Sequence, residues 1–325
     1  MPNTINTLLL LALPASGKSE VRRYLSLLST DQCQTDFHMG PTVQLDDFPY
    51  VHMMRRIDDE LSVLGQNGVF YQGPQGLFVD GREWGTLIQL MNQDYADLLA
   101  NNVETPDSAA LLLFDRIDAA SVAVGMPARL AKLEGSARTA VADKLEREAR
   151  ELLDEKHDNY PDTLEGKTIV IEFARGGKDG STMPLSDSYG YQYSVAQLSE
   201  TILNNASILY IWVTPEESRR KNEARTDPND PGSILHHGVP LTVMLNEYGC
   251  DDMDWLEENT EKPGTITISA HGTTYHVPIG RFDNRVDKTS FIRDDNSLWS
   301  SEDVSAVHNG LKSGLDQIAK LALGD

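Results

Sequence analysis

The sequence predicts an α/β fold in which helices cover both faces of a parallel sheet and a mostly helical segment is inserted between two of its strands. Four short apolar runs, at residues 7–13, 42–45, 168–173 and 207–213, are continuous rather than alternating. Strands that are buried on both faces have this pattern. Helical patterns lie between the runs, which favours βαβ units and three layers.

The longest interval between these expected strands predicts the insertion. Residues 1–49 and 166–325 are expected to form the core, and residues 50–165 a mostly helical insertion or cap. A linker to a separate domain is the alternative, although no joint rich in Pro, Gly or Ser marks one. The elements expected within the insertion are helices at 50–64, 83–99 and 127–154 and a hairpin at 68–81.

The C-terminal part predicts a hairpin followed by a closing helix. Residues 266–282 alternate in the manner of two strands, with Ala270, His271 and Gly272 at the turn. The second arm, at 276–282, is expected to supply the last core strand. An amphipathic helix is expected at 301–323.

Composition and charge exclude several classes of partner. The chain has 325 residues, of which 28 are Lys or Arg and 50 are Asp or Glu, so its net charge is −22. Such a surface repels nucleic acid and anionic membranes, and an anionic ligand needs a local concentration of donors. The two cysteines form no CxxC pair, and the N-terminus lacks a signal sequence. We therefore expect a cytoplasmic protein that binds no nucleic acid and no membrane.

One short motif predicts a phosphate-binding loop. The string ALPASGKS, from Ala12 to Ser19, joins the first apolar run to a helical pattern. It matches the phosphate-loop pattern Gly-x4-Gly-Lys-Ser/Thr except that Ala12 stands at the first glycine, where alanine is tolerated if φ stays negative. A strand-like run that precedes SGKS by chance is the alternative. The residues expected to bind the nucleotide are Leu13, Pro14, Ala15, Ser16, Gly17, Lys18 and Ser19.

The physical reason for these residue types lies in the charge of a triphosphate. Backbone N–H groups of the loop and of the helix N-terminus surround the phosphates, and Gly17 lets the backbone come close. Lys18 neutralises the β- and γ-phosphates, and Ser19 offers its hydroxyl to Mg²⁺.

With this motif the sequence resembles the P-loop NTPases and, among them, the nucleoside- and nucleotide-kinase-like small-molecule kinases. The motif lies within about the first 20 residues, and the wider similarity is one of layout over about half of the chain. The resemblance implies a three-layer P-loop core that uses ATP and Mg²⁺. It also implies phosphoryl transfer to a small hydroxyl-bearing acceptor, for example a nucleoside or nucleotide.

Acidic residues at the ends of apolar runs are the candidates for the catalytic base and for a second Mg²⁺ ligand. Asp46 and Asp47 follow the second run, at the strand end where ligands sit in parallel sheets. We favour Asp46, as base and as metal ligand with Ser19, and Asp47 is the close alternative. Asp47 before Pro49 is also a plausible helix N-cap.

Two further acids compete for these roles. Glu172 lies in an apolar run, where a charge is costly unless it is paired or belongs to a site. Deoxynucleoside kinases, which the layout resembles, have a Glu-Arg pair after the third strand, whereas here Arg175 follows three residues later. Arg175, Gly176 and Gly177 are expected to form a flexible basic loop facing the site. Asp115 follows an apolar stretch that is compatible with either a strand or a helix.

The densest basic cluster follows the fourth apolar run. Thr214 as N-cap, Pro215 and Glu217 predict a helix start with a capping box. The helix resembles the lid of nucleotide-type kinases, whose arginines stabilise the transferring phosphoryl group. Ion pairing of these bases with Glu216, Glu217 and Glu223 on a solvated helix is the alternative. The candidate lid residues are Arg219, Arg220 and Arg225, with Lys221 beside them.

Three weaker candidates complete the prediction. Asn284, with Asp287, follows the last expected strand, where adenine often rests in P-loop kinases. His236 and His237 are expected to have a loop or packing role, because adjacent histidines are poor ligands for one metal. Residues 71–85 line an acceptor pocket or form an ordinary surface hairpin.

Two functions of other classes remain open at this point. The first is a regulatory NTPase that uses water as acceptor and acts through a protein partner. The string Asn284-Arg285-Val286-Asp287 resembles the guanine-binding Asn-Lys-x-Asp, with Arg in place of Lys. The second is a binding protein that keeps the loop and lacks turnover.

Overall fold

A mostly parallel six-stranded sheet forms the centre of the described part of the chain. The computed structural model describes residues 4–225 and 238–324. The strand order is β2-β3-β1-β4-β6-β5, and β5 alone is antiparallel to its neighbour. The strands are β1 (Thr7–Leu11), β2 (Thr42–Asp46), β3 (Thr168–Phe173), β4 (Ala206–Trp212), β5 (Thr265–Ala270) and β6 (Thr273–Asp283).

The apolar runs of β1, β3 and β4 are strands buried on both faces, as expected, whereas β2 lies at the edge of the sheet and is buried only at alternate residues, so the expectation for residues 42–45 is wrong. Every residue of β1 and of β3 is buried. The register pairs Asp46 with Glu172 and Leu10 with Glu172, so the carboxyl ends of β1, β2 and β3 meet at one edge of the sheet. This edge is where an open parallel sheet binds ligands.

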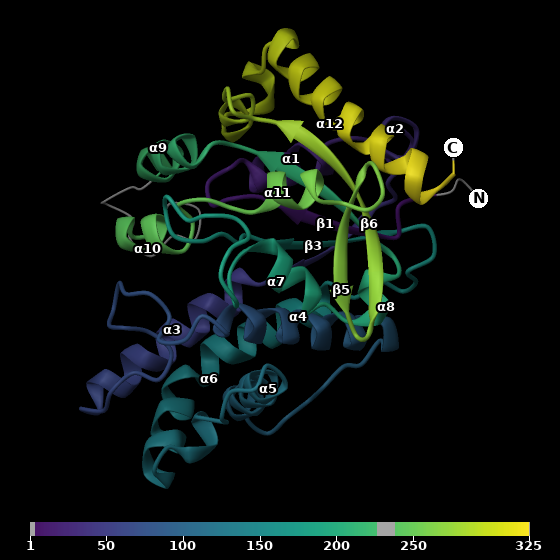
Figure 1. Ribbon diagram of the computed structural model, residues 1–325. Helices are drawn as coiled ribbons and strands as arrows, with labels where there is room; N and C mark the ends of the chain where they lie inside the picture. The colour runs from purple at the N-terminus through teal and green to yellow at the C-terminus, as the bar shows by residue number, and fades with distance from the viewer. Residues whose placement is uncertain (1–3, 226–237, 325) are drawn as a thin grey trace.

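Helices cover both faces of the sheet (Figure 1). On one face α1, α2 and α12 enclose an apolar cluster with Leu8, Leu10 and Leu209 of the strands. On the other face the helices from α3 to α8 enclose a larger cluster. The helices are α1 (Lys18–Ser26), α2 (Thr30–Phe37), α3 (Phe48–Val63), α4 (Glu83–Ala100), α5 (Ala109–Ala123), α6 (Gly135–Asp158), α7 (Gly190–Ala196), α8 (Glu200–Leu203), α9 (Pro215–Arg225), α10 (Leu241–Asn246), α11 (Met253–Glu258) and α12 (Ser301–Ala322).

The interval between β2 and β3 holds α3, α4, α5 and α6 and adds no strand to the sheet. The helix expected to begin at Pro127 begins at Gly135, so its predicted start is wrong. The physical reason is Asp118 of α5, whose carboxylate accepts hydrogen bonds from the backbone N–H groups of Arg129, Leu130 and Ala131. These bonds hold residues 129–131 in a separate turn.

The predicted C-terminal hairpin is confirmed. Its turn places His271 at φ 50° and Gly272 at φ 73°, the positive values that a tight two-residue hairpin turn requires. Strand β6 then continues past its partner and pairs in parallel with β4, from Ile208 opposite Ile279. Gly280 lets α12 approach closely, because a Cβ at this position would lie 2.0 Å from the carbonyl oxygen of Gly314.

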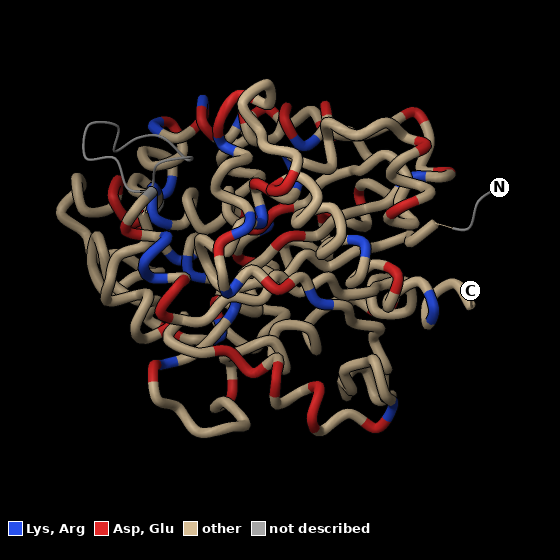
Figure 2. The backbone as a smooth tube through the Cα atoms, turned by 90° about the horizontal axis from the view of Figure 1, so that it is seen from above, with Lys and Arg blue, Asp and Glu red and all other residues tan. Residues whose placement is uncertain are grey.

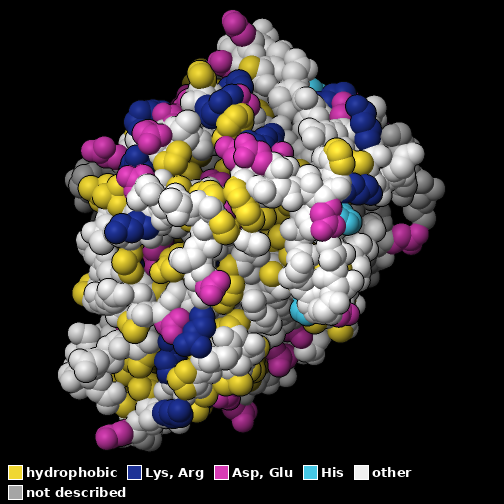
Figure 3. Space-filling model, in the orientation of Figure 1, with side chains coloured by type: hydrophobic (Ala, Val, Ile, Leu, Met, Phe, Trp, Pro, Cys, Tyr) yellow, Lys and Arg dark blue, Asp and Glu magenta, His cyan; other side chains and the backbone are white. Residues whose placement is uncertain are grey.

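Charged side chains are spread over the molecule. Acidic residues lie around the whole circumference in Figure 2. On the face in Figure 3 the basic side chains are dispersed among acidic and apolar ones. Among the described residues, no helix is both long enough and apolar enough to cross a bilayer.

Candidate active site

The loop of residues 12–17 lies at a topological switch point of the sheet. It joins β1 to α1, and β1 lies between β3 and β4. The connection that leaves β1 leads to β2 on one side, whereas the connection that leaves β4 leads to β5 and then β6 on the other. Divergent connections open a crevice at the carboxyl ends of the strands, which is the usual ligand site of such sheets.

The loop presents three consecutive backbone amides without acceptors. Ala15 and Gly17 have positive φ values of 54° and 105°, and Ala12 does not, as its tolerance at the first position requires. Within the described part of the chain, the amides of Ala15, Ser16 and Gly17 find no hydrogen-bond acceptor. Left-handed residues alternating with right-handed ones turn successive N–H groups toward one point and form an anion-binding nest. The following helix N-terminus adds a partial positive charge.

Neighbouring segments hold the loop by its carbonyl groups. The Ser218 hydroxyl of α9 donates to the Pro14 carbonyl at 2.6 Å, and the Asn284 side-chain amide donates to the Ser16 carbonyl at 2.7 Å. A Cβ at Gly17 would lie 2.5 Å from the Thr289 hydroxyl oxygen. These bonds fix the carbonyls on the outside of the loop, which leaves its amides directed inward.

The position of Asn284 argues against its expected contact with adenine. Its side chain is fully buried, and its amide nitrogen is shared between Ser16 and Thr289. Asp287 forms an ion pair with Lys221 at 2.9 Å. Asn284 therefore holds the loop, and Asp287 holds α9. Their partners Ser16 and Lys221 lie more than 60 residues earlier in the chain, so the sequence alone did not reveal these contacts.

Lys18 and Ser19 open α1 directly after the nest. Lys18 is buried. Burial raises the pKa of the Asp47 carboxyl above its usual value, and the positive charges of Arg175 and Lys18 oppose this rise. Ser19 is exposed. Arg22, one turn further along the same helix face, lies 2.7 Å from Glu172 and 3.5 Å from Asp46. Ser19 and Arg22 are three residues apart and so lie on neighbouring positions of one face of α1.

Asp46 has the electrostatic environment of a group that exchanges protons near neutral pH. Burial raises its pKa to about 7, and the negative charges of Glu172 and Asp47 act in the same direction. The Phe48 amide and Arg22 oppose this shift. A general base works best when its pKa lies near the operating pH.

Asp47 and Arg175 form a buried ion pair, with Oδ2 and Nη1 2.7 Å apart. Arg175 is 1% exposed and also donates to Ser194, to Ala174 and to the carbonyl of Trp84. The expected flexible basic loop at Arg175, Gly176 and Gly177 is therefore wrong. These glycines are packed as well, since a Cβ at Gly176 would lie 2.4 Å from the Cys250 carbonyl oxygen.

The fold decides two questions that the sequence left open, namely whether Asp47 caps α3 and whether Asp115 lies in a strand or a helix. Asp47 makes no side-chain cap on α3, because its carboxylate faces Arg175, and Asp46 accepts from the Phe48 amide instead. Asp115 lies within helix α5, is exposed and pairs with Arg138 at 2.6 Å. The strand interpretation of its surroundings is wrong, and Asp115 lies outside the site.

The described bases of α9 have acidic partners in this conformation. Arg219 lies 3.2 Å from Glu216, and Arg220 lies 2.7 Å from Glu217. These pairs match the alternative of a solvated helix, although Ser218 joins the same helix to the loop. The side chain of Arg225, together with His236 and His237, lies outside the residues whose side chains the structure describes.

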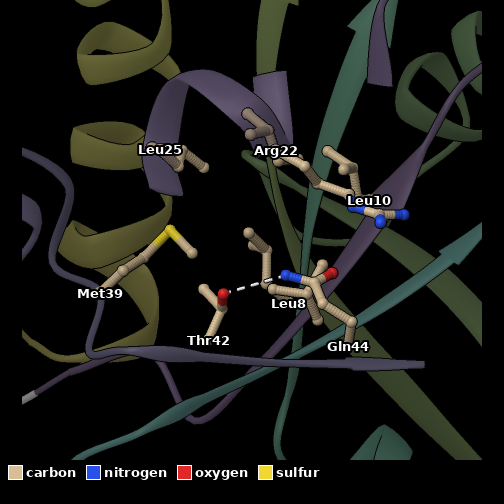
Figure 4. A pocket seen from close by; sticks show the side chains of 9 residues that line it. Leu8, Leu10, Arg22, Leu25, Met39, Thr42 and Gln44 are labelled. Carbon is tan, nitrogen blue, oxygen red and sulfur yellow. Dashed lines mark hydrogen bonds between the residues drawn. The ribbon is translucent and has the colours of Figure 1, made fainter. Parts of the chain in front are cut away.

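A small cavity beneath α1 is not a ligand site. Figure 4 shows Arg22 extending past Leu10, with Leu25 and Met39 on the other side and a hydrogen bond between Gln44 and Thr42. The cavity measures about 10 Å³. That space is at most enough for one water molecule.

No family model, no curated protein and no solved structure matches this chain. The geometry of the site is therefore the basis for any functional conclusion. Within residues 4–225 and 238–324, no group of three or more His, Cys, Asp or Glu could hold a metal ion. Mg²⁺ does not need such a cage, because it usually binds one or two protein oxygens together with water and substrate phosphates.

Proposed function

We propose that this protein is an ATP-dependent phosphotransferase with a three-layer P-loop core and a small hydroxyl-bearing acceptor. The observation that carries the proposal is the inward-facing set of amides at Ala15, Ser16 and Gly17, followed by the buried Lys18 at a helix N-terminus. In a chain of net charge −22, this combination supplies the local donors that a triphosphate requires.

The residues at the carboxyl edge of the sheet fit ATP with Mg²⁺. The backbone of residues 13–17 and the Lys18 ammonium would hold the phosphates. Ser19 and Asp46 would hold Mg²⁺, which neutralises charge on the phosphate oxygens. Two oxygen ligands of this kind suit a metal that keeps several waters.

Asp46 is the proposed base, and Glu172 is its neighbour across Arg22. The acceptor hydroxyl gives its proton to the Asp46 carboxylate while the acceptor oxygen bonds to the γ-phosphorus and the bond from that phosphorus to ADP breaks. Arg22 contacts both Glu172 and Asp46, and the negative charge of Glu172 adds to the burial that raises the pKa of Asp46. Asp47 is less suited to this role, because its carboxylate is already engaged in a buried ion pair with Arg175.

The basic residues of α9 are proposed to act in a closed state. Arg219 and Arg220 would exchange their carboxylate partners for the oxygens of the transferring group, and Arg225 is proposed as the third basic residue of this lid. The bond from Ser218 to Pro14 couples this helix to the loop that holds the phosphates.

The experiment that tests the function is an assay of ADP formation with a panel of hydroxyl-bearing acceptors. We expect ADP formation to depend on acceptor and to be lost in Lys18→Ala. Lys312→Ala is the matched control, because Lys312 pairs with Asp316 on the surface of α12 and should retain activity. Equal ADP formation without any acceptor would favour a regulatory NTPase that uses water. Full activity of Lys18→Ala would contradict the proposed site.

A further inference from the structure

The first amide of the loop is oriented by a side chain of helix α9. The carbonyl of Pro14 and the N–H group of Ala15 belong to one peptide unit. The Ser218 hydroxyl, which is fully buried, donates to this carbonyl at 2.6 Å. Because the C=O and N–H groups of a planar trans peptide point in opposite directions, a donor on the outside of the loop turns the Ala15 N–H group toward its inside.

The third amide of the loop is oriented in the same way by the segment after β6. The carbonyl of Ser16 shares its peptide unit with the N–H group of Gly17, and it accepts a hydrogen bond of 2.7 Å from the Asn284 side chain. Asn284 is also fully buried. Alternate peptide units of the loop are thus each held by one buried donor, and the amide of Ser16 lies between them.

The conformation of Ala15 needs such support. Its φ is 54°, a left-handed value that is strained for a residue with a Cβ. Rotation of the peptide unit between Pro14 and Ala15 would relieve this strain and turn the amide out of the loop. Strained residues persist only where their surroundings determine the conformation. The bond from Ser218 opposes the rotation, because the rotation would break it.

The two donors belong to segments that also bind each other. Lys221, one turn after Ser218 on α9, is 3% exposed and lies 2.9 Å from Asp287. Asp287 accepts a hydrogen bond from the backbone amide of Thr289. The Thr289 hydroxyl in turn accepts from the Asn284 side chain at 3.0 Å. Helix α9 and the segment after β6 therefore support the loop as one unit.

Helix α9 is held on its other side as well. Asn222 donates to the carbonyl of Val239 and accepts from the amide of the same residue, both at 2.8 Å. The donor at Ser218 is therefore in place before any ligand arrives. Preorganisation of this kind lowers the cost of binding, because the ligand does not have to order the loop.

A buried hydroxyl at the centre of the loop indicates that an anion completes this arrangement. The side chain of Ser16 is 1% exposed, and its Oγ atom has no hydrogen-bond partner among the described residues. A buried polar group without a partner is costly and needs an explanation. A bound anion with several acceptor oxygens would satisfy this hydroxyl together with the loop amides.

We infer that Ser218 and Asn284 are positioning residues for the polyphosphate, which set its affinity by holding the Ala15 and Gly17 amides in the binding direction. Both residues act through the loop and not on the nucleotide base, so this role replaces the expected contact of Asn284 with adenine. The effect of each residue is the same for every ligand that carries the polyphosphate. This inference rests on the proposed phosphotransferase function.

The test measures by calorimetry the affinity of folded variants for MgATP and for magnesium tripolyphosphate, which has no base. We expect Ser218→Ala and Asn284→Ala to bind both ligands about three- to tenfold more weakly, because each variant loses one orienting hydrogen bond. Ser305→Ala is the matched control, since the Ser305 hydroxyl donates to a carbonyl at 2.7 Å within α12. Its affinity for both ligands should be unchanged.

A substitution at Ala15 separates positioning from a general structural role. Glycine adopts positive φ values without strain. Ala15→Gly should therefore restore most of the lost affinity when it is combined with Ser218→Ala, and it should change the affinity little by itself. A loss of affinity that came only from a less stable fold would not be reversed in this way.

The possible outcomes distinguish the positioning role from the proposed function. If Asn284→Ala fails to fold, the comparison of Ser218→Ala with and without Ala15→Gly decides. The positioning role would be overturned by unchanged affinities in the folded variants, by a loss for MgATP without a loss for tripolyphosphate, or by no recovery with Ala15→Gly, and each result would leave the kinase standing. Failure of the unmodified chain to bind MgATP would instead overturn the proposed function.

Discussion

Asp46 and Asp47 are adjacent, yet their carboxylates lie in different surroundings. Successive residues at the end of a strand point to opposite faces, so Asp46 meets Arg22 of α1 and Asp47 meets Arg175. The first pair is partly exposed and the second is buried. Two acids that the sequence could not distinguish therefore have different expected roles.

Replacing Asp46 with Asn tests its role as base. We expect kcat to fall by about 100-fold or more, since general bases contribute factors of this size. In the unmodified chain, kcat should rise with pH because the carboxylate is the active form. Burial raises the pKa of this carboxyl to about 7 without metal, and Mg²⁺ bound to Asp46 would lower it, so the rise should be complete below pH 7. A pH–rate profile measures both effects, and Gln44→Ala on the same strand is the control.

The same substitution should stabilise the fold at high pH. The folded-state pKa of Asp46 is raised, so its favourable contribution is complete below the unfolded pKa of about 4 and is lost as pH rises through about 7. Asn carries no charge to bury, and Arg22 keeps Glu172 as its partner. We expect Tm at pH 8 to rise by about 1–3 °C. A lower Tm would show that the pair with Arg22 outweighs the burial of charge.

Arg175→Ala tests the buried ion pair. The substitution leaves Asp47 buried without a partner and removes packing on Trp84. A loss of about 3–5 kcal/mol in the free energy of unfolding is expected, measured by urea denaturation. Arg147→Ala, which removes an exposed pair within α6, should change stability little. Similar losses in both variants would contradict the assigned difference in burial.

At the scale of single elements, the loop before α1 has a specific requirement for glycine. Gly17 has φ 105°, and a Cβ would collide with the Thr289 hydroxyl. In Gly17→Ala we expect weaker nucleotide binding and a loss of about 1–3 kcal/mol in stability. Gly65 also has positive φ but has open space around it, so Gly65→Ala isolates the backbone strain. Equal nucleotide affinities in the two variants, measured by calorimetry, would show that the collision has no effect on the loop.

Helix α9 shows which parts of an element are readable from sequence. It begins at Pro215 as predicted, and the Thr214 hydroxyl accepts from the Glu217 amide. The second bond of the predicted capping box, from the Thr214 amide to the Glu217 carboxylate, is absent among the described residues. The Glu217 carboxylate accepts hydrogen bonds from Arg220 instead. Local hydrogen-bonding rules thus give the helix start, whereas competition between nearby charges decides which side chain pairs with which.

At the scale of the whole molecule, the strands and the C-terminal hairpin were predictable because their signals are local. Continuous apolar runs and a turn with positive φ depend on neighbouring residues. Strand order and the roles of Arg175 and Asn284 were not predictable, because they depend on distant contacts. Asn284, for example, binds a carbonyl 268 residues earlier in the chain. The position of the loop between β1 and α1 was predictable, and the side chains that hold it, Ser218 and Asn284, were not.

Raised carboxyl pKa values give the whole molecule an expected pH dependence of stability. Burial raises the pKa of Asp46 and Glu247 to about 7 and that of Asp251 to about 6. Their favourable contribution is lost as pH rises through these values, whereas groups with lowered pKa, such as Glu146 at about 2, contribute fully above about pH 4.5. Tm should therefore be highest near pH 5–6 and lower at pH 8, as scanning calorimetry would show. A steady rise of Tm from pH 5.5 to 8 would contradict this balance.

The central claim is that the amides of Ala15, Ser16 and Gly17, with Lys18, hold a nucleoside triphosphate. Isothermal titration of the purified chain with MgATP and with MgGTP tests it most directly. We predict one-to-one binding of at least one of the two, and affinity at least about tenfold weaker in Lys18→Ala, because a charged hydrogen-bonding partner is lost. Absence of measurable binding to the unmodified chain, or equal affinity in Lys18→Ala, would contradict the account.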